Sequence, residues 1–302
     1  MSKQLPSALL IVGLMVLATL FPVASLQAQS GSQQVSITLE PGDELRQGRT
    51  ALLRVQGPDI VQAQATFLGT MIQLHPTNVG DWVGFLAISM DATPGESTLD
   101  VFTWTTLEQP PTITSRPVTV LYGEFDSQDI EISYSLEPLL DPELNAENFD
   151  RIERVHQRTT PERMFTSFVQ PIPGPVISAF GGFRVYNTDQ LTGRHTGVDY
   201  RAVVGTPVGA ASDGRVVFAE HLPIHGNHVI IDHGWGILTG YSHLSEIMVV
   251  PGQLVRQGEI IGLVGNTGRV QGPHLHWEMA VNGYWIDAAQ FLTLNIPLPA
   301  PE

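Results

Sequence analysis

The chain has 302 residues, of which 42% are hydrophobic, and this length and composition suit two domains with packed cores. It contains no cysteine, which excludes disulfides and thiolate metal sites and leaves His, Asp and Glu as the usual metal ligands. The formal net charge is −15, and no cluster of Lys and Arg could follow a phosphate backbone, so we expect no nucleic-acid partner.

The first 28 residues have the order of a secretory signal peptide. Lys3 gives the positive start, an apolar run spans Ala8–Leu20, and small residues follow up to Ala28. The alternative is a retained membrane anchor, but the run is shorter than the roughly 20 residues that a bilayer requires. We therefore predict an exported protein, placed outside the cell, in the cell envelope or in the periplasm, with no membrane association after signal cleavage.

Residues 34–123 alternate short apolar runs with turn residues. This spacing predicts an immunoglobulin-like β-sandwich with no metal or nucleophile constellation. His75 stands alone among the strands and is expected to be an ordinary surface or half-buried histidine. The expected strands are Val35–Leu39, Ala51–Val55, Ala63–Phe67, Thr70–Leu74, Asp81–Ile88, Thr98–Trp104 and Thr112–Leu121.

Residues 124–172 form a connector in which we expect one helix, over about 142–158. Asp141 supplies a cap and Pro142 the first helical position. Acidic residues come early and arginines late, as the helix dipole favours. His156 falls near the end of this helix, where we expect a surface or dipole-facing side chain. The segment Pro171–Pro175 breaks regular structure and marks a domain boundary.

Residues 173–295 again carry strand signals, punctuated by glycines, with hardly room for a long helix. We expect a second, antiparallel all-β domain. Its main strands are predicted over residues 206–208, 214–220, 228–232, 237–243, 259–264 and 274–280.

Eight of the ten histidines lie between residues 195 and 276. In the strand that contains them, His274 and His276 are two residues apart and so point to one face. His195 and Asp199 are four residues apart, and they can converge on one ion if the chain turns at Gly197. Two histidines and a carboxylate are a common ligand set for a catalytic zinc, which leaves one position open for water. Zinc acidifies such a water to a pKa of roughly 7, and hydrolysis then requires further proton-transfer groups.

A series of short motifs runs through the C-terminal part, over about 120 residues from Val176 to Phe291. The motifs are Phe180-Gly-Gly-Phe-Arg184, His195-Thr-Gly-Val-Asp199, Gly205-Thr-Pro-Val208, Ala211-Ser-Asp-Gly-Arg-Val216, Tyr241-Ser-His-Leu244, Val255-Arg-Gln-Gly258, Gly262-Leu-Val-Gly-Asn-Thr-Gly268 and Gly272-Pro-His-Leu-His-Trp-Glu278. Together they closely resemble the lysostaphin/LytM-type zinc endopeptidases. The strand order of this family is similar to the barrel-sandwich hybrid.

The resemblance implies that His195, Asp199 and His276 bind one zinc ion per chain and that His243 and His274 are catalytic. It implies hydrolysis of peptide bonds in bacterial peptidoglycan, so the expected partners are peptidoglycan peptides. Family members cut polyglycine bridges or stem-peptide crosslinks, and the sequence leaves this choice open. None of the five residues is replaced, which favours an enzyme over the alternative, a non-catalytic module that recruits or activates another wall hydrolase.

Other polar residues of this region are given lesser roles. The remaining histidines match no required position of the motifs, and we expect surface or turn positions with a possible part in lining the substrate groove; they are His221, His225, His228 and His233. Arg184 and Tyr186 precede the first ligand closely enough to reach the substrate. A third idea, a carbohydrate-binding protein, would use the N-terminal sandwich, but no residue pattern establishes it.

Overall fold

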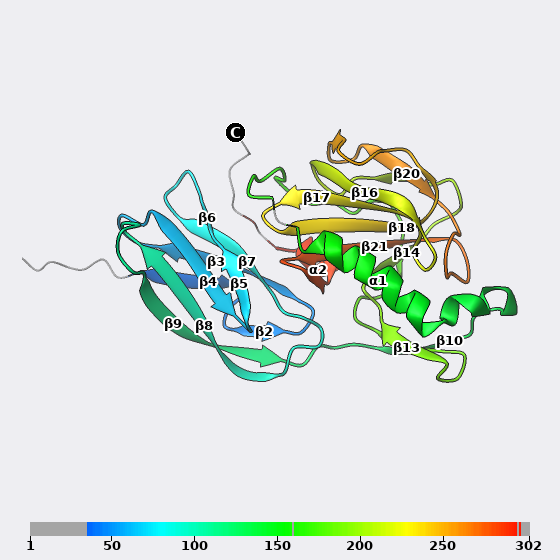
Figure 1. Cartoon of the computed structure of the whole chain (residues 1–302), viewed down its shortest axis with the longest axis horizontal. Helices are drawn as coiled ribbons and strands as arrows, with labels where there is room; N and C mark the ends of the chain where they lie inside the picture. Colours follow the sequence, from blue (N-terminus) through cyan, green and yellow to red (C-terminus); the bar gives the residue numbers. More distant parts are fainter. Residues whose placement is uncertain (1–34, 159, 295, 297–302) are drawn as a thin grey trace, which may run out of the picture. The chain divides into compact units, whose positions relative to one another are not determined.

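The protein is described by a computed structural model that covers residues 35–158, 160–294 and 296. These residues form a mostly β structure with few helices (Figure 1). The predicted signal peptide lies outside the described residues. Within the described ranges, none of the helices combines the length and apolar character needed to cross a membrane.

The N-terminal region is built from two sheets, and several of their strands bury alternate side chains. In β1 (Ser36–Glu40), for example, Ile37 and Leu39 are buried while their neighbours are exposed. One sheet has the order β1-β3-β7-β6 and the other the order β2-β9-β8-β4-β5. The remaining strands are β2 (Glu44–Arg46), β3 (Thr50–Gln56), β4 (Gln62–Phe67), β5 (Thr70–Gln73), β6 (His75–Pro76), β7 (Trp82–Ala87), β8 (Gly95–Trp104) and β9 (Thr112–Leu121).

The described N-terminal residues include two strands more than the sequence predicted. The additional strands are β2 and β6, which have three and two residues and are too short to show a periodic pattern. β2 pairs in parallel with β9, whereas the other pairs in these two sheets are antiparallel. His75 is half-buried, and its ring stacks on Trp235 with centroids 4.4 Å apart.

The connector contains more structure than the single helix expected. It forms β10 (Ser127–Ile130), the 3-10 helix η1 (Tyr134–Leu140) and α1 (Pro142–His156). α1 begins at the expected proline, and the Asp141 carboxylate accepts a 2.9 Å hydrogen bond from the Leu144 N–H. β10 pairs in parallel with β12 (Phe183–Tyr186), so the connector is joined to the C-terminal region by a sheet.

The expectation of a surface position for His156 is wrong. Its side chain is 1% exposed because the end of α1 packs on the C-terminal region, where the ring lies edge-on to Trp285. Burial lowers the pKa of His156 to about 4, so the imidazole is neutral at pH 7. Ile152 and Val155 of the same helix pack with Phe218 and Ile230 in a small apolar cluster.

The C-terminal region is a ten-stranded sheet in which every pair is antiparallel, as expected. Its main path runs β11-β14-β21-β18-β17-β16-β19, with β15, β20 and β22 attached beside it. The strands are β11 (Val176–Ser178), β14 (Gly197–Arg201), β15 (Pro207–Gly209), β16 (Gly214–Leu222), β17 (Gly226–Gly234), β18 (Ile237–Ile247), β19 (Leu254–Val255), β20 (Ile260–Val264), β21 (His274–Val281) and β22 (Tyr284–Ile286).

Two smaller elements complete this region. β13 (Leu191–Arg194) pairs with β12 in the three-stranded sheet β10-β12-β13, and α2 (Ala288–Phe291) follows β22. α2 is capped by Asp287, whose carboxylate accepts from the Ala289 N–H. The only long helix among the described residues is α1, which agrees with the expectation of little helix after residue 173.

Candidate metal centre and active site

Strand register brings the predicted ligands together. β14 and β21 pair so that Asp199 lies opposite His276, and on the other side of β21 Ser242 of β18 lies opposite His276. Since side chains alternate along a strand, His274 and His276 share one face of β21, while Leu275 packs in the core on the other. His195 lies just before β14 and approaches from the chain that leads into it.

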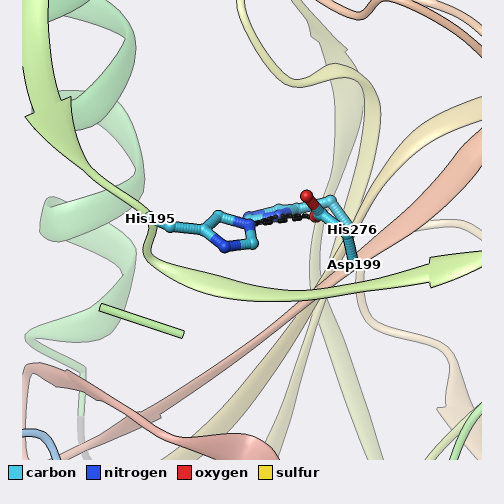
Figure 2. A group of neighbouring side chains, drawn as sticks. All are labelled: His195, Asp199 and His276. Atoms are coloured by element: carbon cyan, nitrogen blue, oxygen red, sulfur yellow. Dashed lines mark hydrogen bonds and ion pairs between the residues drawn. The ribbon is translucent and has the colours of Figure 1, made fainter. Parts of the chain in front are cut away.

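Three ligand atoms converge at one point (Figure 2). His195 Nε2 lies 2.9 Å from Asp199 Oδ1 and 3.0 Å from His276 Nδ1, and the latter two atoms are 2.8 Å apart. All three side chains are buried, and they form a group that could hold a metal ion. Two imidazole nitrogens and one carboxylate oxygen suit zinc and leave a coordination position open.

His195 and Asp199 are also held in place by contacts on the side that faces away from the convergence point. The outer nitrogen of His195, Nδ1, lies 2.7 Å from the Ala179 carbonyl, which fixes the proton there and directs the Nε2 lone pair inward. The outer oxygen of Asp199, Oδ2, accepts a 2.8 Å hydrogen bond from Arg184, which leaves Oδ1 for the convergence point. Arg184, which the sequence placed near the substrate, therefore contacts Asp199 directly.

The charges of the group follow from its burial and its contacts. Burial opposes ionisation of Asp199, but His195 and His276 hold the pKa of its carboxyl well below the ordinary value. Burial lowers the pKa of His195 to about 4. Burial also acts against a charged His276, but hydrogen bonds to Asp199 and Glu278 raise its pKa to about 9. In the metal-free protein at pH 7, a proton on His276 thus occupies a nitrogen that a cation would take.

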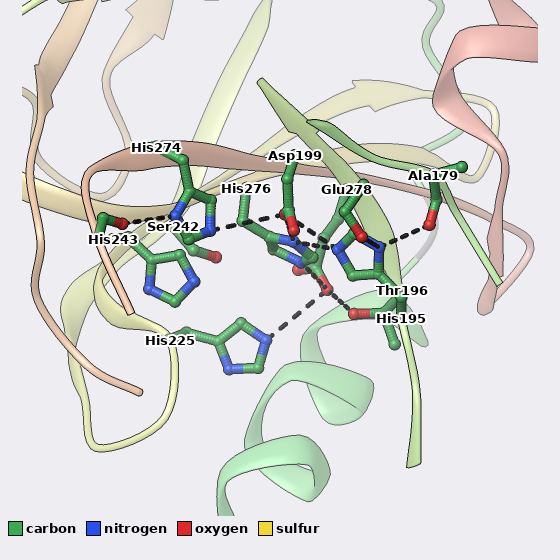
Figure 3. Close-up of polar contacts among 12 residues, drawn as sticks. Ala179, His195, Thr196, Asp199, His225, Ser242, His243, His274, His276 and Glu278 are labelled. Atoms are coloured by element: carbon green, nitrogen blue, oxygen red, sulfur yellow. Dashed lines mark hydrogen bonds and ion pairs between the residues drawn. The ribbon is translucent and has the colours of Figure 1, made fainter. Parts of the chain in front are cut away.

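His243 and His274 lie beside this group, and His274 Nε2 lies 3.7 Å from Asp199 Oδ1 (Figure 3). His243 Nδ1 lies 2.9 Å from the Thr267 carbonyl, and His274 Nδ1 lies 2.8 Å from the Gly272 carbonyl. A carbonyl only accepts, so both Nδ1 atoms carry the proton and both Nε2 atoms keep a lone pair. Burial lowers the pKa of both imidazoles, which keeps them neutral at pH 7.

The backbone at His243 is unusual. Its φ is +63°, in the left-handed region that few residues other than glycine adopt. Its N–H donates a 2.8 Å hydrogen bond to the His225 carbonyl, which helps to hold this conformation. Such conformations cost free energy and are found where a side chain must be aimed at a site.

Two cavities meet at the site. One has a volume of about 260 Å³ and is walled by α1 through Asn145 and Phe149, and the other, about 600 Å³, is walled by β10 and by the chain before His274. Four side chains line both cavities and so mark where they join: Arg184, Tyr186, His243 and Arg269. The connector thus contributes walls on both sides of the histidines.

The expectation of surface or turn positions is wrong for His228 and His233, which are buried within β17, whereas His225 lies in a turn as expected but is buried there. All three side chains are at most 4% exposed. Each is buried because a polar partner is available: Asn148 for His225, Ser242 for His228, and Thr239 with the Asp213 carbonyl for His233. His221 is exposed, as expected.

No role was predicted for Glu278 from the sequence, although this residue ends the motif that contains His274 and His276. Glu278 is fully buried and forms a second group of candidate ligands with His225 and His276. The signal was present, because Glu278 continues the alternation of His274 and His276 on one face of β21. Its partners His225 and Asn148 could not be found that way, since they come from a turn and from α1.

A protein-family comparison matches residues 193–288, the M23 region, to peptidase family M23. The C-terminal region of this chain belongs to peptidase family M23. This chain is 40% identical over 137 residues to the peptidoglycan DD-endopeptidase ShyA of Vibrio cholerae, a match that covers 45% of this chain and 31% of ShyA. It is also 40% identical over 134 residues to the DD-carboxypeptidase/endopeptidase Mpg of Neisseria meningitidis, covering 44% of this chain and 30% of Mpg.

A solved structure supports the fold over a longer part of the chain. A crystal structure described as an M23 peptidase from Pseudomonas aeruginosa superposes with a TM-score of 0.59 and 24% identity. The match covers 82% of this chain and 93% of that one, so it extends beyond the M23 region. At this identity the likeness concerns the fold alone. The match to the two curated relatives spans less than a third of their length.

Proposed function

We propose that the chain is a zinc metalloendopeptidase that hydrolyses peptide bonds in peptidoglycan, with one zinc held by His195, Asp199 and His276. The observation that carries this proposal is the meeting of two kinds of group at one place. Three buried ligand atoms converge, and two neutral histidines, His243 and His274, present free Nε2 atoms beside them. A site with ligands alone would support binding but not proton transfer.

The chain's own residues perform the proton movements of this mechanism. Bound zinc would supply the Lewis acid that polarises the scissile carbonyl and lowers the pKa of a water molecule. His243 and His274 present lone pairs at Nε2 that can accept a proton during attack and return it to the leaving amine. Once protonated, either Nε2 can donate a hydrogen bond to the developing oxyanion. Their Nδ1–H bonds to the backbone fix both rings during these steps.

We further propose that the bond cut is a DD crosslink. Two relatives that are 40% identical to this chain over 137 and 134 residues are described as a DD-endopeptidase and a DD-carboxypeptidase/endopeptidase. This favours stem-peptide crosslinks over the polyglycine bridges that the sequence left open. The two cavities on either side of the histidines have room for peptide on both sides of a scissile bond.

The proposal includes a signal peptide and a division of the chain into two domains joined by a connector. Residues 1–28 would direct export, which would bring the enzyme to the cell envelope. Residues 34–123 would form an immunoglobulin-like sandwich that acts as a spacer or wall-binding module, followed by the connector over 124–172. Residues 173–295 would form the peptidase domain, of barrel-sandwich-hybrid form.

Digestion of purified sacculi tests the proposed function. Sacculi with direct DD crosslinks and sacculi with polyglycine bridges are incubated with the zinc-loaded protein, and mass spectrometry identifies the fragments. We expect crosslinked dimers of the first type to become monomers and the second type to stay intact. Matched samples of His243→Ala test the regulatory alternative, because a recruiting module would keep its biological role without this histidine. Zinc-loaded protein that releases no fragment from either wall would overturn the proposal.

A further inference from the structure

The third proposed ligand has a buried carboxylate behind it. Glu278 lies two residues after His276 on the same face of β21, and its side chain is fully buried. A carboxylate in such a position is costly unless donors surround it. The residues opposite Glu278 on both neighbouring strands are glycines, Gly197 and Gly240. A Cβ on Gly240 would lie 3.0 Å from Glu278 Oε2, so the absence of a side chain there makes room for the carboxylate.

Three donors surround one oxygen of Glu278 (Figure 3). His276 Nε2 lies 3.2 Å from Oε1, and the Thr196 hydroxyl donates a short hydrogen bond to the same atom. His225 Nε2 lies 3.7 Å away, beyond hydrogen-bond length but close enough for electrostatic attraction. Glu278 therefore faces the outer nitrogen of His276 rather than the convergence point.

This contact determines which nitrogen of His276 is free. An ionised carboxylate only accepts, so Nε2 carries a proton, and it is Nδ1 that offers its lone pair once a cation displaces the second proton. Nδ1 is the atom that lies beside His195 Nε2 and Asp199 Oδ1. Metal-binding histidines are commonly oriented in this way by an outer carboxylate.

His225, which faces Glu278 at 3.7 Å, is in turn hydrogen-bonded to helix α1. The Asn148 carbonyl oxygen accepts a 2.9 Å hydrogen bond from the Ile224 N–H, so its amide nitrogen must be the donor in the 2.6 Å contact with His225 Nδ1. His225 then carries its proton on Nε2, the atom that faces Glu278. Asn148 is 2% exposed although it lies on a helix surface, which shows that α1 buries this side chain against the M23 region.

We propose that Glu278 is the positioning residue of the third metal ligand and that His225 and Asn148 extend this support to helix α1. The proposal rests on the proposed function, because it presupposes that His276 binds zinc. Under this proposal the connector supports the metal centre through Asn148 of α1. A connector that only separated two domains would have no such contact. Glu278 acts through His276 and does not touch the substrate.

A second metal ion is the competing explanation, since His225, His276 and Glu278 also form a candidate ligand group. That site would need lone pairs at both nitrogens of His276 once Nδ1 binds the first ion. It would also need His225 to accept at Nε2, although Asn148 already donates to Nδ1. Neutral histidine offers one lone pair, so the observed donors favour orientation over a second ion.

Zinc affinity of the full mature protein tests this proposal. Metal-free samples are titrated with zinc against a chromophoric chelator, and thermal unfolding of each metal-free sample checks the fold. Glu278→Gln keeps the size of the side chain but replaces the accepting charge with an amide. We expect zinc affinity to fall by about 10- to 100-fold with one zinc still bound at saturation. Unchanged affinity in a folded Glu278→Gln sample, or two zinc ions per chain in the parent, would overturn the proposal.

The extension to α1 is tested by a pair of variants on the same helix. Asn148→Ala removes the donor to His225, and Ile152→Val removes a buried methyl one turn further along without touching the contacts among Asn148, His225 and Glu278. We expect a several-fold loss of zinc affinity in Asn148→Ala and none in Ile152→Val. Equal losses would show that loosened packing alone is responsible and would overturn the role of Asn148. If Glu278→Gln does not fold, the number of zinc ions bound by the parent still tests the role of Glu278, since two per chain would overturn it.

Cobalt(II) substitution gives a readout that packing changes alone do not move. The visible absorption of bound cobalt depends on ligand arrangement, so we expect Glu278→Gln to alter the spectrum and Ile152→Val to match the parent. Failure of this proposal is distinct from failure of the proposed function. A parent protein that binds no zinc contradicts the proposed function, whereas a parent that binds zinc as tightly as Glu278→Gln contradicts only the role of Glu278.

Discussion

The rings of His243 and His274 lie 4.9 Å apart between centroids, although the residues come from different strands. Each ring donates from Nδ1 to a backbone carbonyl, so both free Nε2 atoms belong to the same small space beside the proposed metal ligands. Two neutral imidazoles in this arrangement can divide the work of one hydrolysis. One can hold the proton taken during attack while the other stabilises the oxyanion.

We therefore expect His243→Ala and His274→Ala to bind zinc like the parent and to lose hydrolysis. Removal of one proton-transfer or oxyanion group costs a factor of roughly 10² or more in rate. The measurement is the initial rate on a soluble crosslinked peptide, together with zinc content by elemental analysis. Hydrolysis near the parent rate by either zinc-loaded variant would show that its histidine has no catalytic role.

Asp199→Ala should abolish stoichiometric zinc binding. Asp199 Oδ1 is the shared partner of both ligand nitrogens, and its loss removes the only anionic ligand of the three. Elemental analysis after dialysis against trace zinc measures the effect, and the rise of the melting temperature on zinc addition gives a second readout, because zinc stabilises only a folded site. Asp129→Ala is the matched control, since Asp129 lines the larger cavity but lies outside the ligand group. Equal zinc content in the two variants would contradict the ligand assignment.

The sequence was informative wherever the site depends on spacing along one strand. The two-residue period placed His274 and His276 on one face, and the four-residue spacing of His195 and Asp199 allowed them to converge. The strand pairing that brings Asp199 opposite His276 joins residues far apart in the chain, and only the resemblance to known endopeptidases indicated it. The structure supplied this pairing directly.

The parts that were missed depend on packing between distant segments. Glu278 could have been noticed from its alternation with His276, but its partner His225 is held by Asn148 of a helix 77 residues away in sequence. The burial of His156 and His233 could not be predicted either. Histidine is a polar residue type, and its burial depends on partners that the local sequence does not reveal. β10 was missed because its four residues pair with a strand that lies beyond α1.

Acid should destabilise the protein partly through His233. Burial lowers the pKa of His233 to about 4 from an ordinary value of 6.5, so between these values the unfolded chain binds a proton that the folded chain does not. This contribution to the free energy of unfolding is fully present above pH 6.5 and is lost as the pH falls toward 4. Below pH 4 it does not change further. It amounts to about 3 kcal/mol at most.

The measurement is the free energy of unfolding in urea at several pH values from 7.5 to 4, for the metal-free parent and for His233→Gln. Glutamine keeps a hydrogen-bonding group near Thr239 but cannot be protonated. We expect His233→Gln to have a lower free energy of unfolding than the parent at pH 7.5. Below pH 6.5, its free energy of unfolding should fall less steeply than that of the parent. The same fall in both proteins would show that His233 does not contribute to acid destabilisation.

Gly197→Ala should damage the metal centre without changing any ligand. A Cβ at this position would clash with the Trp277 carbonyl on the paired strand and would lie 2.9 Å from His276 Cε1. The carbonyl cannot move away easily, because it belongs to the central strand β21. The added methyl would therefore push β14 from β21 and separate Asp199 from His276. We expect a loss of about 1–3 kcal/mol in unfolding free energy, as for overpacked cores, and a clear fall in zinc affinity.

Gly193→Ala provides the matched control, because a Cβ there would meet no atom within 4 Å. Gly193 lies two residues before His195, and Gly197 lies two residues before Asp199. The pair therefore separates the effect of the clash from the general effect of replacing glycine in a strand. Zinc competition titrations and thermal unfolding of both variants measure the outcome. If Gly197→Ala binds zinc as tightly as Gly193→Ala, the close approach of β14 to β21 does not set the ligand geometry, and Asp199 and His276 tolerate a wider separation than the structure indicates.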